Sequence, residues 1–243
     1  MNSAYSAGAH ASLFGYIARE VMRRHPEDGE AVLEKAVIQY GHERGARMRR
    51  RALTDGLPLN MSTYLLYREY PVDPAEFGGP ECHEPNGDFH STPTKCPWSS
   101  KWKQLGLEQY CGIYCRHVDR ALAEGFDPGC VIDSLGNLTD GAGHCDLYFR
   151  GVNISDPAVA EKMRTWGPRI KNSAALKNWD YQLAHTYASF AASLGEHYSA
   201  GEAQVIMQKA LECFEEEYGA GAAKEFMALT DLDFASTADY AGA

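Results

Sequence analysis

The sequence has little that would carry the protein to a membrane or to nucleic acid. No apolar run in its 243 residues approaches the roughly 18 residues of a membrane-spanning helix. The stretch from Met1 to Gly15 lacks the basic start and long apolar core of a signal peptide. Basic side chains number 23 against 33 acidic ones, and the formal net charge is −10. We therefore expect a cytoplasmic protein that binds neither nucleic acid nor an anionic membrane.

Several common catalytic motifs are also missing. The sequence has no glycine-rich dinucleotide loop, no phosphate loop, no HExxH zinc pair and no GxSxG nucleophile elbow. These absences argue against nucleotide, redox-cofactor and serine-hydrolase chemistry. The seven cysteines are an odd number in a chain without an export signal. This indicates free thiols in a reducing compartment rather than a disulfide framework.

Hydrophobic periodicity and turn signals predict an α+β fold. An aromatic-rich strand is expected at residues 63–70, a long proline-rich loop of the kind that covers a site at 71–95, and a hairpin at 130–150. Helices are expected at residues 9–24, 30–53, 96–126, 179–197 and 201–229. We thus expect a small antiparallel sheet flanked by N-terminal helices and followed by a C-terminal helical region.

Charge is unevenly distributed along the chain. The end of the second helix carries five arginines, which we interpret as a solvated helix end favoured by the helix dipole: Arg44, Arg47, Arg49, Arg50 and Arg51. From Asp180 onward there are two basic and eleven acidic residues. We expect this acidic tail to pack on the basic helix, within one chain or across a homo-oligomer. The expected division is a domain at 1–155 and a helical extension at 156–243, packed on the same core or on a partner subunit.

The densest group of reactive side chains begins at Cys96. Because Pro97 follows, we expect Cys96 at a helix N-cap, where free amides and the helix dipole would lower its thiol pKa. Cys111 and Cys115 are four residues apart and share a helix face, which suits either packing or one half of a metal site. Trp98 lies on the face of a helix that forms either core or an aromatic wall for a ligand.

A carboxylate and two histidines accompany these cysteines. Asp119 fits the N-cap of a short helix that ends at Gly125, and it is equally a candidate catalytic acid or base. His117 would then lie off the helix and pair with a carboxylate near neutral pH. His144 lies in the hairpin turn beside Cys145, where it is either exposed or directed into a pocket.

At this cluster the sequence resembles the L-2-amino-thiazoline-4-carboxylic acid hydrolase family over roughly residues 10–150. The resemblance lies in these stretches: Gly41-x-x-x-Gly45, Cys96-Pro97-Trp98, Trp102, Leu105-Gly106-Leu107, Tyr114-Cys115, Asp119 to Leu122, Gly125-Phe126, Asp140-Gly141 and Cys145 to Arg150. It implies a hydrolase that adds water to the carbon between sulfur and nitrogen of a small cyclic amidine or amide. The ring C–N bond then breaks. The resemblance implies a basic residue in the first hairpin strand, where this chain has Gly136-Asn137. If that position binds a substrate carboxylate in the family, we expect a different substrate here.

We expect the reaction in a pocket between the 96–119 helices and the 130–150 hairpin, under the 71–95 loop. Candidate catalytic residues are Cys96, Asp119, His117 and His144; candidate substrate-binding residues are Trp98, Cys111, Tyr114, Cys115, Asn137 and Cys145. Either a Cys96 thiolate attacks the ring carbon, which we favour, or Asp119 with a histidine activates water.

No cofactor is expected as the first choice, and the partner is a small heterocyclic substrate. The alternative is a non-catalytic binding module similar to 4-vinyl reductase type sensor domains. In that case zinc would be held by Cys96, Cys115 and Cys145.

Overall fold

Polar side chains fix where four of the helices begin in the computed structural model, which describes residues 4–243. Ser6, Asp156, Asn178 and Ser199 each accept a hydrogen bond from a backbone amide in the first turn of the helix that follows. This satisfies an amide that would otherwise lack a partner within the helix. The expected helix at 9–24 is thereby confirmed, and it begins two residues earlier, at Ala7.

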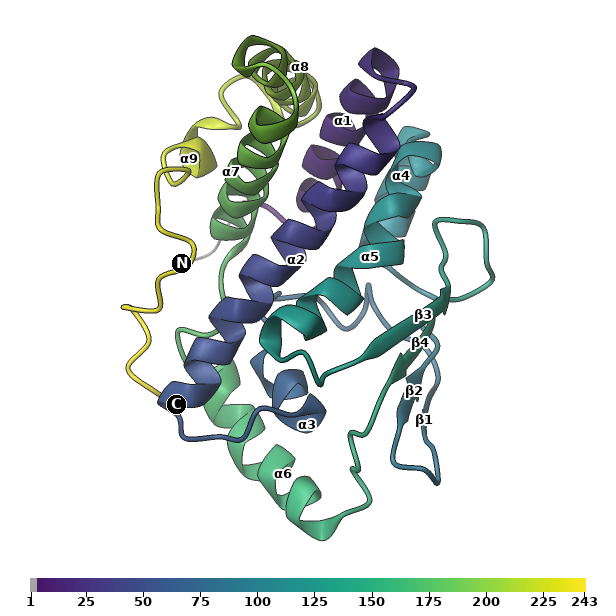
Figure 1. The fold of residues 1–243 in the computed structure, drawn as a ribbon, viewed down its shortest axis with the longest axis vertical. Coiled ribbons are helices and arrows are strands. Elements are labelled where there is room, and N and C mark those ends of the chain that lie inside the picture. The colour runs from purple at the N-terminus through teal and green to yellow at the C-terminus, as the bar shows by residue number, and fades with distance from the viewer. Residues whose placement is uncertain (1–3) are drawn as a thin grey trace.

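The fold is α+β, as expected (Figure 1). Its helices are α1 (Ala7–Arg24), α2 (Gly29–Thr54), α3 (Met61–Tyr64), α4 (Pro97–Leu105), α5 (Glu108–Phe126), α6 (Pro157–Lys171), α7 (Trp179–His197), α8 (Ala200–Tyr218) and α9 (Lys224–Met227). Its strands are β1 (Glu81–His83), β2 (Phe89–Ser91), β3 (Ile132–Gly136) and β4 (Asp146–Phe149), and a 3-10 turn, η1, covers Leu65–Tyr67. Of the described residues, none belong to a helix long and apolar enough to cross a membrane.

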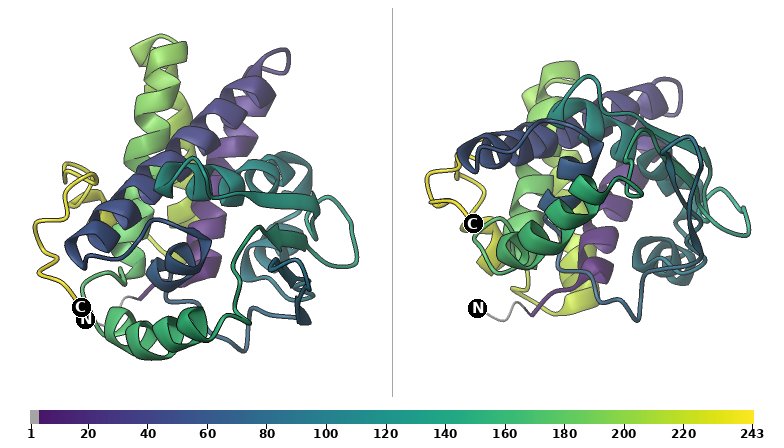
Figure 2. Two further views of the ribbon diagram at one scale, coloured as in Figure 1. Left: turned by 60° about the horizontal axis from the view of Figure 1, so that its bottom comes forward. Right: turned by 90° about the horizontal axis from the view of Figure 1, so that it is seen from below.

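The helices form a bundle to which the sheet is attached at one side. Helices α7 and α8 pack on α1 and α2 of the same chain, while α4 and α5 cover the other side of α1 (Figure 1). Helix α6 crosses the lower end of the molecule, against α3 and η1 (Figure 2). The acidic tail meets the basic N-terminal part where Glu202 of α8 pairs with Arg24 and His25.

The sheet is antiparallel throughout, in the order β1-β2-β4-β3. Strands β3 and β4 form the expected hairpin. Ser134 faces Leu147, and the register shifts before Gly136. Strands β1 and β2 were not expected, because they lie inside the proline-rich 71–95 segment. On β2, Ser91 faces Leu147, so the inserted hairpin extends the same sheet at the edge opposite to β3, the strand that contacts α5.

The predicted strand at 63–70 is wrong. Asn60 caps α3 by accepting the Thr63 amide, and the chain continues through η1 to Tyr67. Tyr64 and Tyr67 are both buried, and their spacing of three places them on one side of these helical turns. The strand preference of aromatic side chains is therefore overridden by a cap and by burial on a helical face.

Helices α2 and α5 pack against each other more extensively than any other pair of described helices, and this packing depends on glycine. A Cβ at Gly41 would lie 2.6 Å from the Ala121 Cβ, and one at Gly45 would overlap the Leu122 carbonyl oxygen. Backbone atoms of the facing helix cannot rotate away as a side chain can. The Gly41-x-x-x-Gly45 pattern thus allows α2 to lie directly on α5, which carries several candidate site residues.

We expect Gly45→Ala to lower the free energy of unfolding by about 1–3 kcal/mol, because the added methyl must push α2 and α5 apart. Gly195→Ala in α7 is the matched control, since nothing lies within 4 Å of its added Cβ. That change should be neutral or stabilising by up to about 1 kcal/mol. Denaturant unfolding measures both. Equal effects of the two changes would show that the close helix contact has no energetic weight.

Candidate active site

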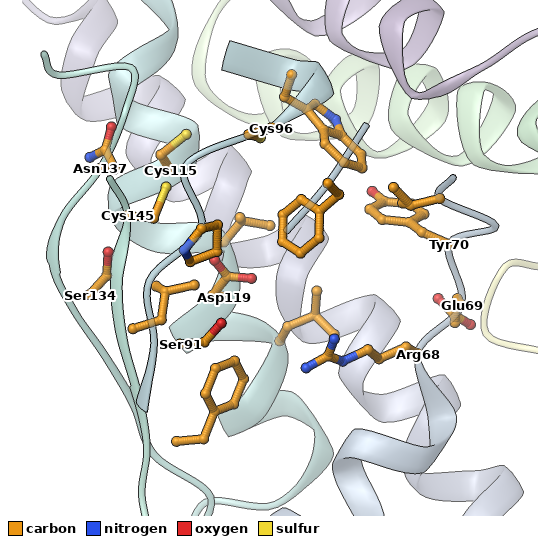
Figure 3. A pocket seen from close by; sticks show the side chains of 18 of the residues that line it. Arg68, Glu69, Tyr70, Ser91, Cys96, Cys115, Asp119, Ser134, Asn137 and Cys145 are labelled. Carbon is orange, nitrogen blue, oxygen red and sulfur yellow. The ribbon is translucent and has the colours of Figure 1, made fainter. Parts of the chain in front are cut away.

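One cavity of about 410 Å3 lies between α2, α5, the sheet and the segment that follows η1. This volume is within the range of roughly 300–1,000 Å3 that is common for small-molecule sites. Its walls are mainly apolar and aromatic, and a few polar groups reach in from different elements (Figure 3). All three segments expected to enclose the pocket contribute to it. Phe77 and Pro93 come from the 71–95 segment.

Seven of the predicted site residues line this cavity: Cys96, Trp98, Tyr114, Cys115, Asp119, Asn137 and Cys145. In Figure 3, Cys115, Cys145 and Asn137 gather at one side of the cavity, and Asp119 lies nearer its centre. The Asn137 amide is already used in the hairpin turn, where it donates to the Asp140 carboxylate at 2.8 Å and accepts the Asp140 amide at 2.9 Å.

Three predicted residues are not part of this cavity. Cys111 is buried in the hydrophobic core, and burial raises the pKa of its thiol. His117 lies in α5 and comes within 3.8 Å of Glu34. His144 is exposed in the turn between β3 and β4. The expected pairing of Asp119 with one of these histidines is therefore not found.

The expected N-cap at Asp119 is also wrong. Helix α5 runs without a break from Glu108 to Phe126, so both His117 and Asp119 lie inside it. Residues two apart on a helix point to different faces. The continuous helix therefore directs Asp119 into the cavity and turns His117 away from it.

The Cys96 thiol differs from the expected activated thiolate. Cys96 does occupy the N-cap position of α4. Burial nevertheless raises the pKa of its thiol to about 11, and this outweighs the lowering by the nearby backbone amide of Ser99. Burial also raises the pKa of Cys115 and of Cys145. The pocket thiols are thus mainly protonated at neutral pH.

The three cysteines expected to hold zinc, if zinc is present, do not form a metal site. Cys96, Cys115 and Cys145 line the same cavity. Within residues 4–243, however, no group of three or more His, Cys, Asp or Glu side chains is arranged to hold a metal ion. The Cys115 Sγ lies instead 3.4 Å from the Thr139 Oγ1.

Asp119 is an unpaired acidic group that lines the cavity. Burial raises the pKa of its carboxyl, and the guanidiniums of Arg68 and Arg44 partly oppose that rise. Within the described chain its carboxylate forms no hydrogen bond or ion pair. A carboxylate of raised pKa that is free of partners suits a general base, because its basicity is available to a bound molecule.

Two arginines of the cavity were missed by the sequence analysis. Arg68 follows η1 in the segment taken for a strand, and its Cζ lies 5.7 Å from the centre of the Phe149 ring. Arg44 lines the deep side, with its Cζ 3.8 Å from the centre of the Tyr70 ring. In the sequence, the one feature that could have marked Arg68 as a site residue is its position beside a run of aromatic residues.

Arg44 belongs to a buried ionic cluster, which corrects the expected solvated helix end. Glu69, fully buried, accepts hydrogen bonds from Arg47 at 2.7 and 2.8 Å and from Arg51 at 2.7 Å, and Arg44 is 3.3 Å away. Burial alone would raise the pKa of Glu69, but the three guanidiniums hold it well below its usual range. Of the five arginines only Arg50 is exposed. The fifth, Arg49, is half-buried and pairs with Asp127.

A hydrogen-bonded group of aromatic side chains fixes the wall behind the cavity. The Tyr70 hydroxyl lies 2.9 Å from that of Tyr40 and 3.2 Å from that of Tyr114. The Trp98 indole donates to the His10 Nδ1 at 2.9 Å, which makes Nε2 the protonated nitrogen of a neutral ring. Burial and the Arg44 charge lower the pKa of His10 to about 3, so this ring stays neutral.

A pocket with an unpaired carboxylate of raised pKa, two cations and aromatic walls defines a small-molecule enzyme of the α+β class. A model of the L-2-amino-thiazoline-4-carboxylic acid hydrolase family matches residues 7–149, more than half of the chain, and the protein belongs to that family. It is therefore a ring-opening hydrolase that acts on a C–N bond of a heterocycle. No curated protein and no solved structure matches the chain.

Proposed function

We propose that the protein opens its heterocycle in this cavity with water activated by Asp119. The observation that carries the proposal is the Asp119 carboxyl, which faces the cavity without a hydrogen-bond partner in residues 4–243 and has a pKa raised by burial. No histidine of the expected catalytic set lines the cavity with it. Asp119 therefore acts alone as the proton carrier.

The proton transfers balance with a single carboxylate. Asp119 takes one proton from water as the oxygen bonds to the ring carbon between sulfur and nitrogen, and delivers that proton to the ring nitrogen. When the ring C–N bond breaks, the proton of the new hydroxyl follows the same route to the nitrogen. The products are a carbonyl group and a primary amine, and Asp119 is again ionised.

The raised thiol pKa of Cys96 supports water over a covalent route. A thiol with a pKa of about 11 is almost entirely protonated at neutral pH, whereas the thiolate is the attacking species. Within the described residues 4–243, the Cys96 thiol has no basic side chain at hydrogen-bond distance that could take its proton. The thiols instead form a weakly polar side of the cavity, against which the substrate ring packs.

We expect Cys96→Ser to change kcat/KM by less than about tenfold, because a side chain that only packs against substrate contributes little to the chemical step. The measurement follows ring opening through the primary amine released, with circular dichroism as a check on folding. Cys145→Ser is the matched control on the same side of the cavity. Loss of turnover in a folded Cys96→Ser protein, with a covalent adduct by mass spectrometry in the wild type, would establish the cysteine route instead.

A further inference from the structure

We propose that Arg68 binds a carboxylate of the substrate, together with the Nη1 of Arg44, which has no hydrogen-bond partner among the described residues. This rests on the proposed function, because it names the second group by which the same cavity holds the molecule that Asp119 attacks. The substrate for which the family is named carries such a carboxylate, and the proposal names the residues of this chain that bind it.

Arg44 is the first observation that points to an anion. It is 97% covered, and its Nη1 is buried without a hydrogen-bond partner, although its Nε lies 3.3 Å from the Glu69 carboxylate. A buried guanidinium nitrogen without an acceptor loses its hydration and has no hydrogen bond to replace it. Since Arg44 lines the cavity, a bound carboxylate would supply the missing acceptor.

Arg68 is the second, independent observation. Within residues 4–243 its guanidinium has no hydrogen bond or ion pair, and its recorded contact is with the face of the Phe149 ring. Figure 3 shows Arg68 extending from the side of Glu69 toward the side of Asp119 and Ser91, across the cavity. Asp73 and Glu81 also line the cavity, and neither pairs with Arg68. A planar guanidinium in this position matches the two oxygens of a carboxylate.

The charge behind the wall favours the same ligand. Among residues 4–243, three buried arginines form ion pairs with a single buried carboxylate, that of Glu69, so the cluster keeps a net positive charge. The two nearby histidines do not change this, because burial lowers the pKa of His10 to about 3 and of His185 to about 4. Arg68 and Arg44 line the same cavity as Asp119. A cation end and an anion end in one cavity complement a molecule with a carboxylate and a basic cyclic amidine.

The test separates binding from turnover by using two probes that cannot be hydrolysed at an amidine. L-Thiazolidine-4-carboxylate carries the carboxylate on a saturated ring, and thiazolidine lacks it. Calorimetry measures their Kd for the wild type, Arg68→Met and Arg44→Met. Arg164→Met is the matched control, because Arg164 is an exposed arginine of α6 that pairs with Glu161.

We expect Arg68→Met to weaken the carboxylate probe about tenfold or more and to leave thiazolidine unchanged, because only the carboxylate uses the guanidinium. Arg44→Met should act in the same direction wherever it folds, and Arg164→Met should match the wild type. The proposal is overturned if the carboxylate probe binds Arg68→Met as tightly as the wild type, if the wild type does not prefer it to thiazolidine, or if Arg164→Met weakens it equally. Because neither probe is turned over, these results stand apart from whether Asp119 activates water.

Discussion

Asp119→Asn is expected to lower kcat/KM by about 100- to 10,000-fold, the usual contribution of a positioned general base. The amide keeps the shape of the side chain and cannot take a proton from water. Ring opening is followed through the primary amine it releases. Glu124→Gln in the same helix, a partly exposed residue paired with Arg120, is the matched control and should leave activity near the wild-type value.

The same substitution should leave stability unchanged or raise it. The folded-state pKa of Asp119 is raised above its unfolded value by burial, so ionisation near neutral pH costs folding free energy. Stability linked to this group therefore falls as pH rises through its pKa, and Asn removes that cost. A catalytic carboxylate that lowers the stability of the fold is typical of an active site. Loss of both activity and melting temperature would instead mark Asp119 as a structural residue.

The dependence of kcat/KM on pH is a second test of the role of Asp119. The base must be ionised, so kcat/KM should rise with pH through an apparent pKa above the ordinary aspartate value of about 3.9. Arg68 and Arg44 hold that pKa down, and Arg68→Met should therefore move the acidic limb to higher pH. An acidic limb that stays in place in Arg68→Met would show that another group controls the rate.

Local sequence patterns were sufficient for the elements that carry the site. The helical periodicity of α1 and α2, the Pro97 after an N-cap at Cys96, and the hairpin signals of β3 and β4 all depend on residues close together in the chain. The cavity could likewise be placed between α5 and this hairpin. The prediction for His117 was wrong for a physical reason: a new helix was expected to begin at Asp119, whereas α5 is continuous there.

What sequence could not predict is the pairing of charges over long separations. Arg44, Arg47 and Arg51 form an ordinary basic helix face until Glu69 is brought between them, 25, 22 and 18 residues away. Glu69 itself lies in a segment whose aromatic residues predicted a strand. The thiol pKa of Cys96 was misjudged similarly, since an N-cap position is visible in sequence and the degree of burial is not.

Glu69→Gln is expected to lower the free energy of unfolding by about 3–5 kcal/mol, because it leaves three buried guanidiniums without a counter-charge. Denaturant unfolding measures the loss. The matched control is Glu161→Gln on α6, which removes an exposed ion pair with Arg164 and should cost at most about 1 kcal/mol. A cost as small as that of the control would show that the arginines are compensated elsewhere.

The cluster also has a role in the site, because it holds the segment from which Arg68 and Tyr70 enter the cavity. Residues 68–70 lie outside any helix or strand, and the Glu69 carboxylate attaches them to α2. Glu69→Asp keeps the charge and shortens the side chain, so it should fold with a smaller loss of stability than Glu69→Gln. The shorter side chain should displace Arg68 and thereby raise KM for the carboxylate substrate. We expect kcat to be less affected, because Asp119 is held separately by α5. A Glu69→Asp enzyme with unchanged KM would show that Arg68 is positioned without the cluster.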